Sequence, residues 1–214
     1  MDDWGKRMRR GGVLLSGEAE RQVVPARLWD RMSITSPDGH PDGFPLTAPG
    51  IRLALGLVDA AFTAVGAVKR GGPRAVPSAG ALYPYEFRVV TGDRDRAGAP
   101  HVLHVDPVRR LAHRLPGESA AWSCERAGLA LPDPGGALVF VVSRPWLSMR
   151  KYGDRGYLYA QLDAAHVATN LLCVSSAAGL PAELRLRFDR DPLLDALGLA
   201  GRCREVHSVV AVGP

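Results

Sequence analysis

Apolar residues recur at three- and four-residue steps in two stretches of the chain, which is the spacing of one face of an α-helix. The first stretch is residues 51–69, after which Gly71 and Gly72 end the pattern. The second stretch is residues 155–178, and at 1.5 Å per residue it predicts a central helix of roughly 35 Å. Gly179 follows it as a C-terminal cap does. Shorter helices are predicted over residues 25–31, 118–131 and 191–199.

Short runs rich in valine and other strand-forming residues predict the strands of a sheet. Residues 137–143 are apolar at every position except the last, so this strand is expected to be buried on both faces. The other predicted strands are residues 86–91, 101–106, 111–115 and 206–212. The pattern therefore predicts a sheet with buried middle strands that is covered by helices.

The length of 214 residues suits one domain. Apolar residues make up 46% and charged residues 23%, so a sizeable core is expected. Residues 1–50 have the least regular pattern, and we interpret them as an N-terminal arm that precedes a domain of residues 51–214. The 24 glycines and 17 prolines indicate many turns.

Three widely spaced cysteines form no Cys-x-x-Cys pair, so neither a disulfide framework nor a zinc site is predicted. The longest apolar run, residues 137–142, is far shorter than the roughly 20 residues of a membrane helix. Residues 13–15 are too short an apolar run for a signal peptide. A cytoplasmic protein without membrane contact is expected.

Basic residues exceed acidic ones, with 27 Lys and Arg against 22 Asp and Glu, a net charge of +5. They are scattered along the chain rather than gathered into the patch that a nucleic-acid-binding protein needs. The balance instead favours a phosphorylated cofactor or an acidic peptide as the partner.

Residues 74–84 form a proline-bounded segment of small residues ahead of a predicted strand. Ser78, Ala79 and Gly80 leave room for a flat ring to approach the backbone, and Arg74 can fork onto the oxygens of a phosphate. An ordinary helix-to-strand connection is the simpler explanation of these residues alone.

Lys151 and Tyr152 lie in residues 145–156, which we interpret as a loop between the buried strand and the long helix. Lysine and tyrosine both titrate near pH 10 in water, so either can move a proton where a pocket lowers its pKa. A loop can aim both side chains inward. The simpler alternative is a solvated lysine beside a packing tyrosine.

Asp163 and His166 lie three residues apart in the long predicted helix, close enough to share a hydrogen bond on one face, and Asn170 follows four residues later. A structural histidine is the simpler explanation, and no further ligand stands at a metal-binding spacing, so no metal site is predicted. The chain also lacks Gly-x-Ser-x-Gly, Walker and Gly-x-Gly-x-x-Gly motifs, which argues against serine-hydrolase, nucleotide-hydrolysing and dinucleotide-binding functions.

In combination, these motifs resemble the SagB-type, McbC-like azoline dehydrogenases of the nitroreductase superfamily. The resemblance covers residues 51–214. It rests on Arg-x-x-Pro-Ser-Ala-Gly-Ala-Leu-Tyr-Pro at 74–84, Lys-Tyr-Gly-x-Arg-Gly-Tyr at 151–157 and Asp-x-x-His-x-x-x-Asn-Leu at 163–171. The sequence departs from the family at residues 184–187, Leu-Arg-Leu-Arg, where a glycine-containing segment is usual.

The resemblance implies an α+β, nitroreductase-like fold, with a mixed central sheet flanked by helices and FMN at the interface of a homodimer. It implies oxidation of thiazolines and oxazolines to thiazoles and oxazoles in a ribosomally made precursor peptide, in a complex with a cyclodehydratase. Lys151 and Tyr152 match the pair held to be catalytic, which removes a proton while flavin N5 accepts hydride; dioxygen then reoxidises the flavin. The residues implied to line FMN are Arg52, Arg74, Ser78, Ala79, Gly80, Gly179 and Leu180.

Two other functions remain open from the sequence. One is a nitroreductase-like flavin reductase that uses NAD(P)H. The other is a flavin-poor scaffold that docks the peptide or a cyclodehydratase, although a scaffold has no need of the Lys-Tyr pair.

Overall fold

A computed structural model describes residues 33–35, 48–62, 74–107, 111–200 and 203–213. Its strands are β1 (Ser33–Thr35), β2 (Tyr85–Arg94), β3 (Pro100–Asp106), β4 (Leu111–Leu115), β5 (Ala137–Ser143), β6 (Ala182–Arg185) and β7 (Glu205–Val212). Its helices are α3 (Pro49–Phe62), the short 3-10 helix η1 (Ala79–Ala81), α4 (Ala120–Arg126), α5 (Pro145–Tyr152), α6 (Arg155–Ala177) and α7 (Asp191–Ala196). The helix predicted over residues 25–31 and most of the predicted arm lie outside the described residues.

The strands form one sheet in the order β1-β4-β3-β2-β5-β7-β6. Every neighbouring pair is antiparallel except β1 and β4, which are parallel, so the predicted mixed sheet is confirmed. All of the predicted strands are present, and the structure adds the short edge strands β1 and β6. β6 has only four residues, and its pairing with β7 rather than a local pattern makes it a strand.

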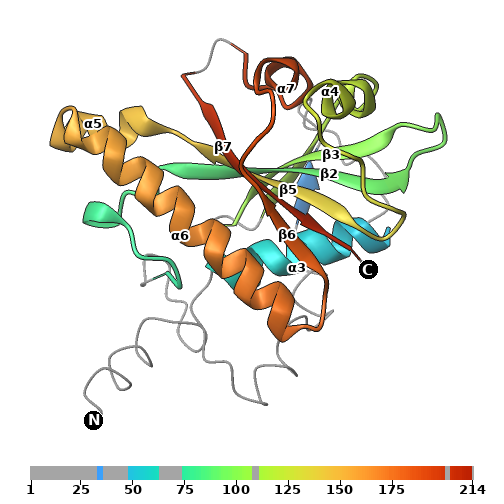
Figure 1. The fold of residues 1–214 in the computed structure, drawn as a ribbon, viewed down its shortest axis with the longest axis horizontal. Helices are drawn as coiled ribbons and strands as arrows, with labels where there is room; N and C mark the ends of the chain where they lie inside the picture. The colour runs from blue at the N-terminus through green and yellow to red at the C-terminus, as the bar shows by residue number, and fades with distance from the viewer. Residues whose placement is uncertain (1–32, 36–47, 63–73, 108–110, 201–202, 214) are drawn as a thin grey trace.

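The β5 strand lies near the middle of the sheet and is buried on both faces, as its sequence predicts. Successive side chains of a strand point to opposite faces. Val139 and Val141 therefore join the core under α3 and α6, whereas Leu138 and Phe140 join the core under α4 and α7. Figure 1 shows these two helix pairs on opposite sides of the sheet.

The long helix α6 spans Arg155–Ala177, within one residue of its predicted range. The described part of α3 ends at Phe62, and the rest of its predicted range lies outside the described residues. The α4 helix ends at Arg126, earlier than predicted, because Gly128 takes a left-handed φ of 76° that a helix cannot continue through.

The loop predicted over residues 145–156 is wrong, because most of this segment is the helix α5. Pro145 begins α5, where the N–H that proline lacks would have had no helical partner. Gly153, with φ 58°, follows its last residue, Tyr152, and α6 begins two residues later. Lys151 and Tyr152 are therefore held on the last turn of a helix rather than on a loop.

Candidate functional site

The backbone of residues 74–84 is strongly turned. Gly80, Ala81 and Tyr83 have positive φ angles of 62°, 55° and 47°. The left-handed conformation costs a non-glycine residue roughly 1–2 kcal/mol, so Ala81 and Tyr83 need compensating contacts. Ser78 supplies two of them: its carbonyl oxygen accepts from the N–H of Ala81 at 3.0 Å, and its Oγ accepts from the N–H of Tyr83 at 2.8 Å.

Asp163 of α6 holds the same segment through its carboxylate. Ser78 Oγ donates to Asp163 Oδ2 at 2.6 Å, and the backbone N–H of Ala79 also donates to this carboxylate. The side chain is buried, and burial raises the pKa of Asp163 although both hydrogen bonds act in the opposite direction. Its predicted partner His166 is exposed, so the hydrogen bonds of Asp163 run to the 78–79 segment instead.

The two predicted motifs meet at Gly80. A Cβ atom built on Gly80 would lie less than 3.0 Å from both Tyr152 Oη and Lys151 Nζ. Lys151 Nζ lies 5.3 Å from the centre of the Tyr152 ring, which in turn packs edge-on against Tyr159 of α6. The absence of a side chain at residue 80 therefore makes room for the predicted catalytic pair.

Near Tyr83 and Asp163, two buried polar atoms have no hydrogen-bond partner among the described residues: Arg74 Nε and Tyr85 Oη. The Arg74 guanidinium carbon lies 5.0 Å from the centre of the Phe62 ring and 5.9 Å from that of Tyr83. Burial raises the pKa of Tyr85, and the nearby Asp163 charge adds to the effect. Since buried polar groups are nearly always paired, these atoms fit contact with a polar ligand such as FMN.

Arg52, Gly179 and Leu180 lie apart from the other predicted site residues. Arg52 is exposed in the first turn of α3, whereas Arg74 packs against Phe62 at the end of that helix. Gly179 and Leu180 follow α6, whose 23 residues span roughly 34 Å. Figure 1 shows α6 running from α5 to the turn before β6. Within one chain, the structure does not bring these three residues to the Lys151 and Tyr152 group.

Asn170, which the sequence left without a role, has a structural one. Its Nδ2 donates to the carbonyl oxygens of Ala61 at 3.2 Å and Ala75 at 3.3 Å. These bonds fasten α6 to the end of α3 and to the start of the 74–84 segment.

A buried cluster of charged side chains lies at the start of β2, the strand that follows residues 74–84. Glu86 at the start of β2 forms ion pairs with Arg88 at 2.9 Å and Arg204 at 2.7 Å. Burial raises the pKa of Glu86, but the surrounding positive charges, led by Arg88, outweigh burial and lower it. Arg144 faces Glu86 and also donates to the carbonyl oxygen of Tyr83 at 3.4 Å. No motif predicts this cluster, because Arg144 and Arg204 are far from Glu86 in the sequence.

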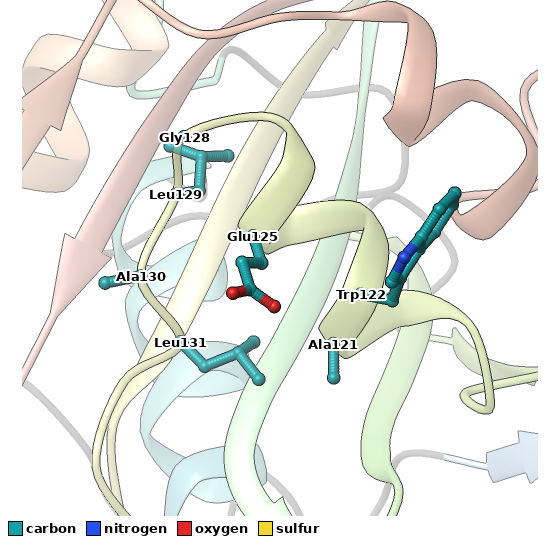
Figure 2. Close-up of a pocket in the computed structure, with 7 residues that line it drawn as sticks. All are labelled: Ala121, Trp122, Glu125, Gly128, Leu129, Ala130 and Leu131. Carbon is teal, nitrogen blue, oxygen red and sulfur yellow. The ribbon is translucent and has the colours of Figure 1, made fainter.

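The pocket in Figure 2 lies on a different part of the molecule. It has a volume of about 440 Å³ and contains none of the predicted site residues. Trp122 is 59% exposed at this pocket, and Figure 2 shows the Glu125 carboxylate near its centre. Its lining residues belong to α4 and the turn after it: Ala121, Trp122, Glu125, Gly128, Leu129, Ala130 and Leu131.

Within the described ranges, no three histidine, cysteine or acidic side chains gather into a group that could hold a metal ion. Across those same ranges, no helix combines the length and apolar character required to cross a bilayer.

The comparison with known proteins starts from sequence. No protein-family model matches the chain. A protein of Methanocaldococcus jannaschii, provisionally named a nitroreductase, is 32% identical over 122 residues. The match covers 56% of this chain and 61% of that relative, so the chain spans less than two thirds of its length.

Solved structures extend the likeness to the fold. A structure of the Escherichia coli microcin synthetase McbBCD complex with truncated pro-MccB17 bound aligns with a TM-score of 0.65 and 20% identity, over 77% of this chain and 64% of that one. A provisionally named nitroreductase of Ralstonia eutropha aligns with a TM-score of 0.59 and 16% identity, over 85% and 88% of the two chains. The described part of this chain therefore has a nitroreductase-like fold, as its motifs implied.

Proposed function

We propose that the protein is an FMN-dependent oxidoreductase that converts thiazolines or oxazolines into thiazoles or oxazoles in a modified precursor peptide. The observation that carries this proposal is the meeting of Lys151 and Tyr152 with Gly80. The nitroreductase-like fold supports flavin chemistry. Similarity to a chain of a synthetase complex with a bound pro-peptide supports a peptide substrate and partner proteins in a synthetase complex, for which we propose a cyclodehydratase.

Oxidation of an azoline removes a hydride equivalent and a proton from the ring. Lys151 Nζ, in its neutral amine form, accepts the proton and becomes an ammonium group, and Tyr152 Oη beside it orients the ring. FMN, when bound, would supply the redox chemistry as the two-electron acceptor, with dioxygen as the terminal oxidant. Residues 78–80 line the cofactor, and Arg74, whose buried Nε has no partner among the described residues, offers its guanidinium to an anionic group.

The separation of the predicted residues supports a homodimer. The exposed face of α6 carries large apolar side chains, with Leu158 61% and Leu162 58% exposed. Large exposed apolar surface marks interfaces. Antiparallel pairing of α6 with its copy covers these leucines and brings the start of one helix beside the end of the other. Gly179 and Leu180 of the partner subunit then lie near Lys151, so each site draws on both chains.

Replacing Leu162 with aspartate is expected to make the protein monomeric, because a buried unpaired carboxylate opposes the apolar contact. The measurement is molar mass by light scattering after size-exclusion chromatography. Leu186→Asp is the matched control, since Leu186 is 55% exposed but follows β6 and is not on α6. A dimer that persists in Leu162→Asp would contradict pairing through α6.

A nitroreductase-like reductase that uses NAD(P)H is the second candidate, which the 32% identity to the archaeal relative favours. One experiment separates the candidates. The protein is reconstituted with FMN, its visible spectrum is recorded, and it is mixed with a synthetic thiazoline peptide in air. We expect flavin absorption and loss of two hydrogens from the peptide by mass spectrometry. Rapid NAD(P)H consumption without peptide would favour the reductase, and colourless protein would contradict both.

A further inference from the structure

Asp163 is a carboxylate that the proposed chemistry does not use. It lies about two turns into α6 and is only 5% exposed. A carboxylate is rarely buried unless it is paired or hydrogen-bonded. Both of its hydrogen-bond donors, Ser78 and Ala79, belong to the segment that carries Gly80.

We propose that Asp163 is a positioning residue of the site, which acts through the Ser78 hydroxyl to hold Gly80 against Lys151 and Tyr152. Its catalytic consequence rests on the proposed function. In this arrangement Asp163 forms its hydrogen bonds with Ser78 and Ala79 and moves no proton.

The Ser78 hydroxyl connects Asp163 to the turn of residues 79–83. It donates to Asp163 Oδ2 at 2.6 Å and accepts from the N–H of Tyr83 at 2.8 Å. The residues that these two bonds enclose include Gly80 and Ala81, both with left-handed backbones. Strained backbone of this kind persists only where surrounding contacts over-determine it. Loss of either bond therefore lets the turn relax away from the Lys151 and Tyr152 side chains.

Both parts of the site, the 78–83 segment and the end of α5, contact the α6 helix. Asp163 fixes the 78–83 segment to it. Gly156 allows α5 to pack closely against α6, because a Cβ at Gly156 would lie less than 3.0 Å from backbone atoms of Ser148 and Met149. The distance from Gly80 to Lys151 is thus set by two attachments to one helix.

The test begins with the protein without flavin. Asp163→Asn removes the negative charge and one of the two acceptor oxygens, and Ser78→Ala removes the hydroxyl that connects Asp163 to Tyr83. We expect amide hydrogen exchange over residues 79–83 to rise by about tenfold in both variants, the loss of a hydrogen bond to a charged group. Ser175→Ala is the matched control, since the buried Ser175 hydroxyl donates to the carbonyl oxygen of Leu171 within α6. Unchanged exchange in both variants would overturn the inference.

The second measurement uses the protein reconstituted with FMN. In both variants kcat for azoline oxidation is expected to fall by about 10²-fold, as small misplacements of reacting groups do. Ser78→Thr keeps the hydroxyl and should restore both kcat and exchange protection. Wild-type kcat in Ser78→Ala would overturn the inference. If the wild-type protein oxidises no azoline while the exchange result holds, the proposed function fails and the structural link between Asp163 and the site stands.

Discussion

Replacing Lys151 with alanine is expected to lower azoline oxidation by about 10²–10⁴-fold, the usual contribution of a general acid or base. The side chain is exposed on the last turn of α5 and makes no core contact, so the fold should survive. FMN absorption should also be retained, because the residues proposed to line the cofactor lie on the 74–84 segment. The measurements are kcat with a synthetic thiazoline peptide and the visible spectrum of the reconstituted variant.

Arg150→Ala is the matched control for Lys151→Ala. Arg150 is the preceding residue of α5 and is also exposed, so its loss removes the same charge from the same helix turn. This variant should keep most of the wild-type activity if the effect belongs to the Lys151 amine rather than to local charge. Full activity in Lys151→Ala would exclude it as the proton acceptor.

The change Gly80→Ala is expected to reduce activity by about 10²-fold through displacement of Lys151 and Tyr152. A Cβ at this position meets the ends of two flexible side chains, so they move and the fold persists. The left-handed φ of 62° adds about 1–2 kcal/mol of destabilisation. Thermal unfolding and kcat measured on the same sample separate the two effects.

Gly98→Ala measures the loss of stability from a side chain at a left-handed backbone position, without a contact to Lys151 and Tyr152. Gly98 also has a positive φ, of 82°, but a Cβ there would have no atom within 4 Å. It should lose about as much stability as Gly80→Ala, roughly 1–2 kcal/mol, and keep its activity. Equal loss of activity in both variants would show that strain, and not contact with the catalytic pair, explains the effect.

The predictions from local pattern were the most accurate for β5 and α6. The apolar run of β5 reflects burial on both faces, and the helical spacing of residues 155–178 predicted the length of α6, because both signals lie in neighbouring residues. The spacing did not predict which side of α6 is buried, since Tyr157 and Leu162 are exposed. The α5 helix was missed because Pro145 and the glycines near its end are typical of loops as well as of helix termini. β6 was missed because it depends on its pairing with β7.

In the candidate site, too, local motifs were predicted from the sequence and long-range contacts were not. Sequence motifs selected Lys151, Tyr152 and Gly80, which the structure brings together. Asp163 was paired with His166 because they are neighbours on a helix, but the fold turns the carboxylate inward to Ser78. Only the packing of α6 against the sheet and the 74–84 segment decides which side of this helix is buried, so the hydrogen-bond partner of Asp163 could not be predicted from spacing.

By itself, the sequence determined the main strands, the long helix and the two motifs, because each depends on residues close together in the chain. Only the tertiary structure decided that Gly80 lies against Lys151 and Tyr152 and that Asp163 holds this turn. These relations depend on how helices pack across the sheet. That packing is set by burial and shape over the whole core, which no local spacing encodes.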